Sequence, residues 1–341
     1  MDTIKPVDEA ELKRWFDRLM DPKAKLADRA RDLWGLRHAK EPAALKYLGK
    51  FLLGVHENKH PSANALLQHE AAYCLGQRQD LKAIDILEKV IDDLDHCPIV
   101  RHEAGEALAA LATVNGTQNA RILEILERNS KSPIVELKET CILGIDRIKF
   151  LDSGKTKDVE NPYPETIDPS PPYPRDLYTP EELRDILMDN TKDLASRYRA
   201  LFSLRNLTVL NEQNCVNTVS NAAKLLSEGL FAEGSALLRH EVAFVLGQIG
   251  HPVTCENLCK CLSDNKEHQM VRHEAAEALG TVMGSSKTAN LPEMEKLAEK
   301  TLNEYLKDKI QVVQESCVLA LDVADYVSGE NFQYASVPTA S

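Results

Sequence analysis

Four His-Glu pairs recur in one sequence pattern. They are His69-Glu70, His102-Glu103, His240-Glu241 and His273-Glu274, and each is followed by a small residue, three variable positions and Leu. With 10 histidines and 53 acidic residues among 341, an acid after a histidine is rare by chance, yet five of the ten are followed by Glu. Imidazole nitrogens and carboxylate oxygens bind iron, manganese and zinc in proteins. The recurrence therefore indicates metal chemistry.

The spacing of the pairs indicates a duplication. His102 follows His69 by 33 residues, His273 follows His240 by 33, and the second set follows the first by 171. Two flanking segments in each half resemble the same pattern without the pair. The residues at the pair's positions there are Ala30-Arg31, Leu137-Lys138, Tyr198-Arg199 and Val313-Gln314. Each half is therefore expected to have four units, with the pair only in the two central ones.

A structural explanation of the pairs is possible, because repeat proteins keep consensus residues for packing. A packing consensus would appear in all eight units, however, whereas the pairs occupy only the central units of each half. This restriction favours a site over a packing role. The remaining histidines, with the isolated His56-Glu57, are expected at the surface; they include His60, His96, His251 and His268.

The elements that carry the pairs are expected to be helices arranged in pairs. In the segment IVRHEAGEALAAL, apolar residues recur at spacings of three and four, which predicts a helix with one buried face. Pro98 is suited to its first turn, Gly116 is expected to end it, and residues 120–128 to form its partner helix. Paired helices with this period predict an all-α fold, an α-α superhelix of about eight HEAT-like repeats in two four-repeat halves.

Proline content suggests the boundaries of the halves. Residues 1–151 are expected to form the N-terminal half, 152–183 a Pro-rich linker, 184–330 the C-terminal half and 331–341 a disordered tail. Within this scheme, Thr179-Pro180-Glu181-Glu182 has the composition of a helix start, with an N-cap, a proline and acidic residues.

The ligand types narrow the metal. Helices packed about 8–10 Å apart allow side chains from two neighbours to meet at one ion, so each half can hold one metal with two His and one or two Glu. Two His and a carboxylate with open positions suit non-haem iron. The residues alone favour dinuclear iron, then manganese, then a two-zinc hydrolase. Glu106 and Glu277, one turn beyond their pairs, are expected to orient the ligands from behind.

Composition restricts the partners. The net charge is −12, which argues against nucleic acid or an anionic membrane and suits a basic protein or a cationic side chain. No apolar run is long enough to span a bilayer, and no signal peptide is evident at the N-terminus. The eight cysteines mostly lie in apolar helical patterns and are expected to be reduced thiols, so the protein is expected in the cytoplasm or nucleus.

At these residues the sequence resembles the deoxyhypusine hydroxylase family. The likeness lies in the two repeat halves, the paired spacings of 33 residues, the phrases QHEAAYCLGQ, VRHEAGEAL, RHEVAFVLGQ and VRHEAAEALG, and the linker text NPYPETIDPSPPYP. The resemblance implies a monooxygenase with two Fe²⁺ ions and O₂ as co-substrate. Its expected substrate is the deoxyhypusine side chain of eukaryotic translation initiation factor 5A, hydroxylated to hypusine, with an unknown electron donor.

The same resemblance implies a ligand set. One iron is expected to take His69, His102 and Glu103, and the other His240, His273 and Glu274. Glu70 and Glu241 are expected to bind iron or the amines of the substrate. Two other classes stay open on the residues alone: a non-catalytic HEAT-repeat scaffold that binds proteins, and a dinuclear metal hydrolase.

Overall fold

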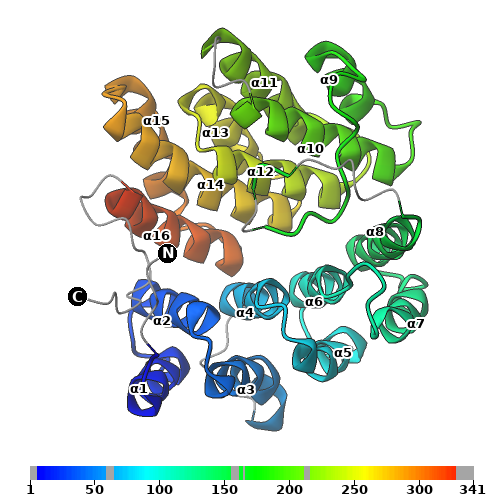
Figure 1. Cartoon of the computed structure of the whole chain (residues 1–341). Coiled ribbons are helices and arrows are strands. Elements are labelled where there is room, and N and C mark those ends of the chain that lie inside the picture. The colour runs from blue at the N-terminus through cyan, green and yellow to red at the C-terminus, as the bar shows by residue number, and fades with distance from the viewer. Residues whose placement is uncertain (1–5, 59–64, 155–160, 164–165, 211–215, 328–341) are drawn as a thin grey trace. The chain divides into compact units, whose positions relative to one another are not determined.

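The computed structural model describes residues 6–58, 65–154, 161–163, 166–210 and 216–327 (Figure 1). These residues form sixteen α-helices, three short 3-10 helices and no strand. The all-α prediction is confirmed, in keeping with a composition rich in helix-forming Ala, Leu and Glu. None of the described helices is both long and apolar enough to cross a bilayer.

The described residues divide into two compact units, one up to Ile148 and one from Lys149 onward. Unit 1 contains α1 (Glu9–Met20), α2 (Leu26–His38), α3 (Pro42–Asn58), α4 (Ala65–Gln77), α5 (Ile84–Asp92), α6 (Pro98–Ala110), α7 (Asn119–Asn129) and most of α8 (Val135–Asp152). Unit 2 contains α9 (Pro180–Met188), α10 (Leu194–Leu210), α11 (Val216–Glu228), α12 (Ala236–Ile249), α13 (Cys255–Ser263), α14 (Gln269–Thr288), α15 (Pro292–Tyr305) and α16 (Gln311–Val327).

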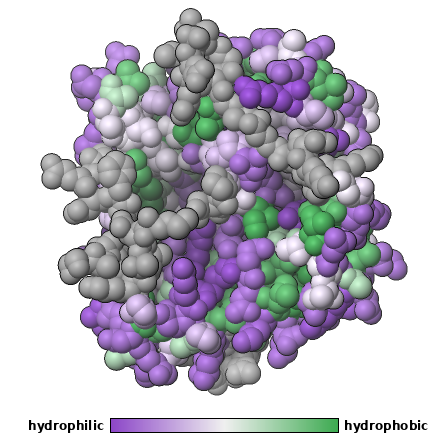
Figure 2. Space-filling view, viewed as in Figure 1, coloured by the Kyte–Doolittle hydropathy of each residue, from purple (hydrophilic) through white to green (hydrophobic). Residues whose placement is uncertain are grey.

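Within each unit the even-numbered helices pack beside one another, α4 against α2 and α6, and α12 against α10 and α14. The odd-numbered helices contact them from behind, as α5 contacts α6 and α13 contacts α14. Buried leucines and alanines fill the space between the two helix rows. Hydrophilic side chains, with hydrophobic ones interspersed, cover the coloured part of the face in Figure 2.

Small residues bring the central helices of each unit close together. A Cβ placed on Gly76 of α4 would lie 2.8 Å from Ala107 Cα of α6. In unit 2, a Cβ on Gly247 of α12 would lie 3.3 Å from Ala278 Cα of α14. Gly247 and Ala278 follow Gly76 and Ala107 by 171 residues each, so the duplicated halves repeat the same close helix contact.

Residues 120–128 form a helix as predicted, within α7, but the expected end of the third repeat's helix at Gly116 and its pairing with α7 are wrong. Helix α6 starts at Pro98 as predicted but ends at Ala110, and it packs more extensively on α5 than on α7. Beyond α6, Asn119 Nδ2 donates to Thr113 O at 2.8 Å, and Thr113 N donates to Asn119 Oδ1 at 3.2 Å. These bonds stabilise a turn over residues 113–119 that contains Gly116, and apolar periodicity does not reveal such side-chain hydrogen bonds.

The predicted start at Thr179 is confirmed. Helix α9 begins at Pro180 under a capping box, in which Thr179 Oγ1 accepts from Glu182 N and Thr179 N donates to Glu182 Oε2 at 2.8 Å. The described residues between α8 and α9 form no helix and pack on α10. There, Tyr173 N donates to Ser203 Oγ at 2.9 Å, and Arg199 Nε donates to Pro171 O at 3.3 Å. The tail expected at 331–341 lies outside the described residues.

The close contact between α4 and α6 makes Gly76 sensitive to substitution. We expect Gly76→Ala to destabilise the protein by about 1–3 kcal/mol, because the added methyl meets the backbone of the neighbouring helix. Gly247→Ala should cost less, since its clearance is 3.3 Å rather than 2.8 Å. The free energy of unfolding in urea measures both.

Gly54 in α3 supplies the matched control, because a Cβ there meets no atom of the described part of the chain within 4 Å. Gly54→Ala should stabilise by about 0.5–1 kcal/mol through helix propensity. Equal effects of Gly54→Ala and Gly76→Ala would contradict the close-contact explanation.

Candidate metal centre

The four His-Glu pairs lie on the second helix of their repeats, α4, α6, α12 and α14. All eight residues are buried, and none is more than 8% exposed; His102 and His273 are fully buried. Alanines and leucines of the same helices make up the surrounding core. Such burial of carboxylates and imidazoles is costly unless they are paired or bind a cation.

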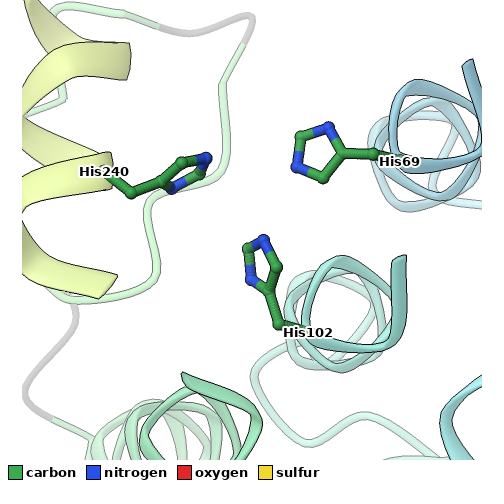
Figure 3. Close-up of side chains that lie close together, drawn as sticks. All are labelled: His69, His102 and His240. Carbon is green, nitrogen blue, oxygen red and sulfur yellow. The ribbon is translucent and has the colours of Figure 1, made fainter. Parts of the chain in front are cut away.

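In unit 1 the pairs of α4 and α6 meet side chain to side chain. The ring centroids of His69 and His102 are 5.5 Å apart, with 37° between the ring planes. His69 Nε2 lies 3.2 Å from Glu103 Oε2, and His69 Nδ1 lies 3.3 Å from Glu70 Oε1. Figure 3 shows both imidazoles projecting from their two helices; His240, also labelled there, lies on α12 of unit 2. His69 therefore has a carboxylate at each ring nitrogen.

Unit 2 repeats this arrangement. The ring centroids of His240 and His273 are again 5.5 Å apart, with 44° between the planes. His240 Nε2 lies 3.4 Å from Glu274 Oε2, as His69 Nε2 does from Glu103 in unit 1. The geometry of the pairs, not only their sequence, is therefore duplicated.

The electrostatics of unit 1 favour positive charge at the pairs. Burial lowers the pKa of the His69 imidazole, but the carboxylates of Glu103 and Glu70 raise it more, so this pKa lies well above its usual range. A proton or a metal ion can supply the positive charge that these carboxylates stabilise.

The predicted donor set of unit 2 fits a metal ion. His240, His273 and Glu274 each offer a ligand atom, and these atoms lie within 4.8 Å of one another. Ligand atoms bound to one ion at about 2.1 Å are about 3–4 Å apart, so small side-chain movements would complete the coordination. Histidine with carboxylate suits iron, manganese or zinc rather than calcium or magnesium.

The predicted accessory residues have different surroundings in the two units. Glu277 Oε1 lies 3.5 Å from His273 Nδ1 and accepts a hydrogen bond of 2.8 Å from Ser316 Oγ. Glu106 lies with His102 and Glu103, each offering a ligand atom within 4.8 Å of the others. The position of Glu277 suits a residue that orients His273, whereas the position of Glu106 suits a direct metal ligand. Both roles stay predictions.

Two buried arginines that sequence reasoning missed position the ligand helices. Arg101 and Arg272 directly precede His102 and His273, and each is at most 4% exposed. Their Nε atoms donate to Ile91 O and to Leu262 O, both at 2.9 Å. These carbonyls lie in the last turns of α5 and α13, where helix carbonyls need partners.

The arginine contact recurs in the capping repeats. Arg29 Nε donates to Leu19 O at 2.8 Å, and Arg197 Nε donates to Leu187 O at 2.9 Å. Arg therefore makes this contact at one register in four repeats, with or without a His-Glu pair, and the recurrence of Arg in the aligned repeats could have revealed it. A fifth Arg at this register, Arg239, instead donates to Glu267. The bond to the carbonyl holds one side of the second helix against the first helix of the repeat. The two residues that follow the arginine, the His-Glu pair in the central repeats, therefore point away from the first helix.

The other histidines match the surface prediction only in part. His268 is exposed and caps α14, and His251 is half-buried and caps a 3-10 turn. The prediction is wrong for His96, which is 4% exposed. Its Nδ1 lies 3.2 Å from Asp93 Oδ2 and its Nε2 lies 3.3 Å from Leu52 O, so polar partners satisfy it inside a loop. The side chains of His56, Glu57 and His60 lie outside the described residues.

Known proteins match both the repeats and the chain as a whole. A model of HEAT repeats matches residues 223–322, and a model of the PBS lyase HEAT-like repeat matches residues 67–93. Deoxyhypusine hydroxylase of Drosophila melanogaster is 41% identical over 91% of this chain and 90% of its own length. The Homo sapiens enzyme of that name is 38% identical over 96% of both chains. The chain belongs to the deoxyhypusine hydroxylase family.

A solved structure agrees. The structure of human deoxyhypusine hydroxylase in complex with glycerol has a TM-score of 0.77 and 37% sequence identity, and covers 93% of this chain and 96% of that one. The predicted HEAT-like architecture and family resemblance are confirmed. As a member of the deoxyhypusine hydroxylase family, the protein is an enzyme, a hydroxylase.

The buried pair of Arg272 and Asp308 generates a stability prediction. Arg272 Nη2 donates to Asp308 Oδ2 at 2.6 Å, with the two side chains 1% and 6% exposed. We expect Arg272→Met to cost roughly 3–5 kcal/mol, because a buried carboxylate and a carbonyl lose their donor. Arg128→Met, which breaks an exposed pair with Asp92, should cost less than about 1 kcal/mol. Unfolding in urea measures both.

The same pair predicts a pH dependence. Burial raises the pKa of Asp308, but the hydrogen bond and charge of Arg272, the backbone hydrogen bond from Ile310 and the charge of Lys309 together lower it more, so the net pKa lies below its usual value. A depressed carboxyl pKa contributes stability above the unfolded pKa of about 3.9, and this is lost as the pH falls through the folded pKa. Asp308→Asn should flatten the stability curve in this acid range. An unchanged curve would show that the pair does not contribute.

Proposed function

We propose that this hydroxylase uses two iron ions and O₂ to hydroxylate the deoxyhypusine side chain of eukaryotic translation initiation factor 5A, forming hypusine. The observation that carries the proposal is the duplicated set of buried ligands, in which two imidazoles lie 5.5 Å apart beside a carboxylate in each unit. Family membership supports the reaction, and the His and carboxylate donors support iron.

Each unit is proposed to hold one iron. His69, His102 and Glu103 would bind the iron of unit 1, and His240, His273 and Glu274 that of unit 2. When bound, the iron ions supply the activation of O₂ and the oxidation chemistry that amino acid side chains lack. An external electron donor is required, because a monooxygenase reduces the second oxygen atom of O₂ to water.

Glu70 and Glu241 are proposed to orient the histidine ligands and to bind the amines of the substrate. Glu70 lies 3.3 Å from Nδ1 of His69, so with Nε2 on the metal the Nδ1–H would donate to Glu70 and fix the ring. Glu241 has the corresponding position in unit 2 and is 2% exposed. The buried carboxylates of Glu70 and Glu241 would also favour binding of the cationic amines of a deoxyhypusine side chain. The protein thus positions a long amine and excludes water around it.

Metal content of variants tests the ligand sets. The wild-type protein, loaded with Fe²⁺ without oxygen, should bind about two irons, as helical dinuclear proteins do. His102→Ala and His273→Ala should each reduce this to about one, because each removes a ligand from a single unit. His38→Ala is the control, since His38 is exposed and only hydrogen-bonds Trp34 O. Full iron content in both variants would contradict the assignment.

The two carboxylates beside His69 should behave differently. We expect Glu103→Gln to weaken iron binding strongly because it removes a direct ligand. Glu70→Gln should retain iron and reduce affinity by only about 10–100-fold, as loss of an orienting partner does. Titration with Fe²⁺ distinguishes them. If Glu70→Gln removed the iron as completely as Glu103→Gln, Glu70 would be a ligand itself.

A further inference from the structure

Two equivalent arginines have different surroundings in the two units. The segments ADRARDLWGLRH (27–38) and ASRYRALFSLRN (195–206) align without gaps, which matches Arg37 with Arg205 and Trp34 with Phe202. Arg37 Cζ lies 4.9 Å from the Trp34 ring centroid, and Arg205 Cζ lies 4.9 Å from that of Phe202. The guanidinium is therefore held on an aromatic ring in the same way in both units.

In unit 2 this guanidinium binds a carboxylate from an extended segment. Asp168 accepts two hydrogen bonds from Arg205, at 2.7 Å and 2.6 Å. Arg205 also lies 4.4 Å from the Tyr163 ring centroid and donates to Gln248 of α12 at 3.3 Å. Arg205 is 0% exposed. Its site is thus complete, with the acid and one ring supplied by the Pro-rich segment before α9.

In unit 1 the second ring comes from α4 instead. Arg37 Cζ lies 5.5 Å from the Tyr73 ring centroid, and the Trp34 and Tyr73 rings are 6.0 Å apart. All three side chains are only partly buried. Among the described residues, no carboxylate lies within ion-pair distance of Arg37. Unit 1 therefore holds the arginine and the rings, whereas the acid that completes the site in unit 2 has no counterpart among the described residues of unit 1.

We propose that Arg37, Trp34 and Tyr73 bind an aspartate or glutamate on an extended segment of the protein substrate. Tyr73 is four residues after His69 on α4, so the acid would bind about one helical turn from the metal ligands. The assignment of this acid to the protein substrate rests on the proposed function. The chemistry of the site rests on its equivalence to Asp168 and Arg205.

The properties of a stacked guanidinium support a carboxylate as the ligand. Arginine held on aromatic rings keeps its planar fork free to bind a carboxylate through two hydrogen bonds. Partial burial weakens competition from water, which strengthens such bonds. In a chain of net charge −12, Arg37 is a half-buried arginine with no carboxylate within reach among the described residues.

Trp34 provides a direct readout of binding. The chain has 2 tryptophans, Trp15 and Trp34, so in Trp15→Phe the intrinsic fluorescence reports Trp34 alone. The probe is a synthetic peptide of residues 161–173 with Glu165→Gln, so that Asp168 is its single acid. We expect saturable binding, with at least about tenfold weaker affinity for the Asp168→Asn peptide, because a charge-assisted bond is lost. Calorimetry on the protein with Trp15 intact repeats the measurement.

Arg37→Gln should abolish the preference for the acidic peptide, while Arg14→Gln, at an exposed residue of α1, should retain it. Equal binding of both peptides, or an effect unchanged in Arg37→Gln, would overturn the proposal. So would binding that appears only after removal of residues 331–341, since the chain's own tail would then be the occupant.

This fluorescence test uses neither metal nor turnover, so its failure is distinct from failure of the proposed function. For the substrate as source, Arg37→Gln should raise KM for the protein substrate about tenfold and leave kcat unchanged. An unchanged KM, with peptide binding lost, would exclude the substrate as the source of the acid.

Discussion

The close approach of two helices in each unit is the constraint on which the candidate site depends. Gly76 against Ala107 leaves no room for a larger side chain, and Gly247 against Ala278 leaves little. Because imidazole and carboxylate arms are short, helices held further apart could not place two of them on one ion. The geometry of the site therefore depends on the glycine as well as on the histidines. Its repetition at the same register explains why both units show ring separations of 5.5 Å.

Burial of the ligands links metal binding to stability. Each unit buries two imidazoles and two carboxylates of the pairs among apolar side chains, and such groups favour a bound cation. A metal that binds only the folded chain would therefore stabilise it. The buried arginines behind the ligand helices have the complementary role, because they fix helix rotation through carbonyl contacts that need no metal.

Much of this architecture could be predicted from the sequence. The duplicated helices and the pairs follow from periodicity and spacing, because helix faces and repeat lengths are local properties. The end of α6 and the burial of His96 were mispredicted, since side-chain hydrogen bonds in turns stabilise the local structure at both places. The roles of Arg101 and Arg272 were missed because a charged residue suggests solvent exposure. The bidentate ion pair of Arg205 with Asp168 joins residues 37 positions apart, and no local sequence pattern reveals such a pairing.

Oxygen isotope incorporation tests the central claim most directly. The protein, reduced and loaded with Fe²⁺, would be given its deoxyhypusine-bearing substrate under ¹⁸O₂, and the product analysed by mass spectrometry. We predict one ¹⁸O atom in each hydroxylated side chain, with no product when iron is withheld. Product oxygen derived from water, or full turnover without iron, would contradict an O₂-dependent iron hydroxylase.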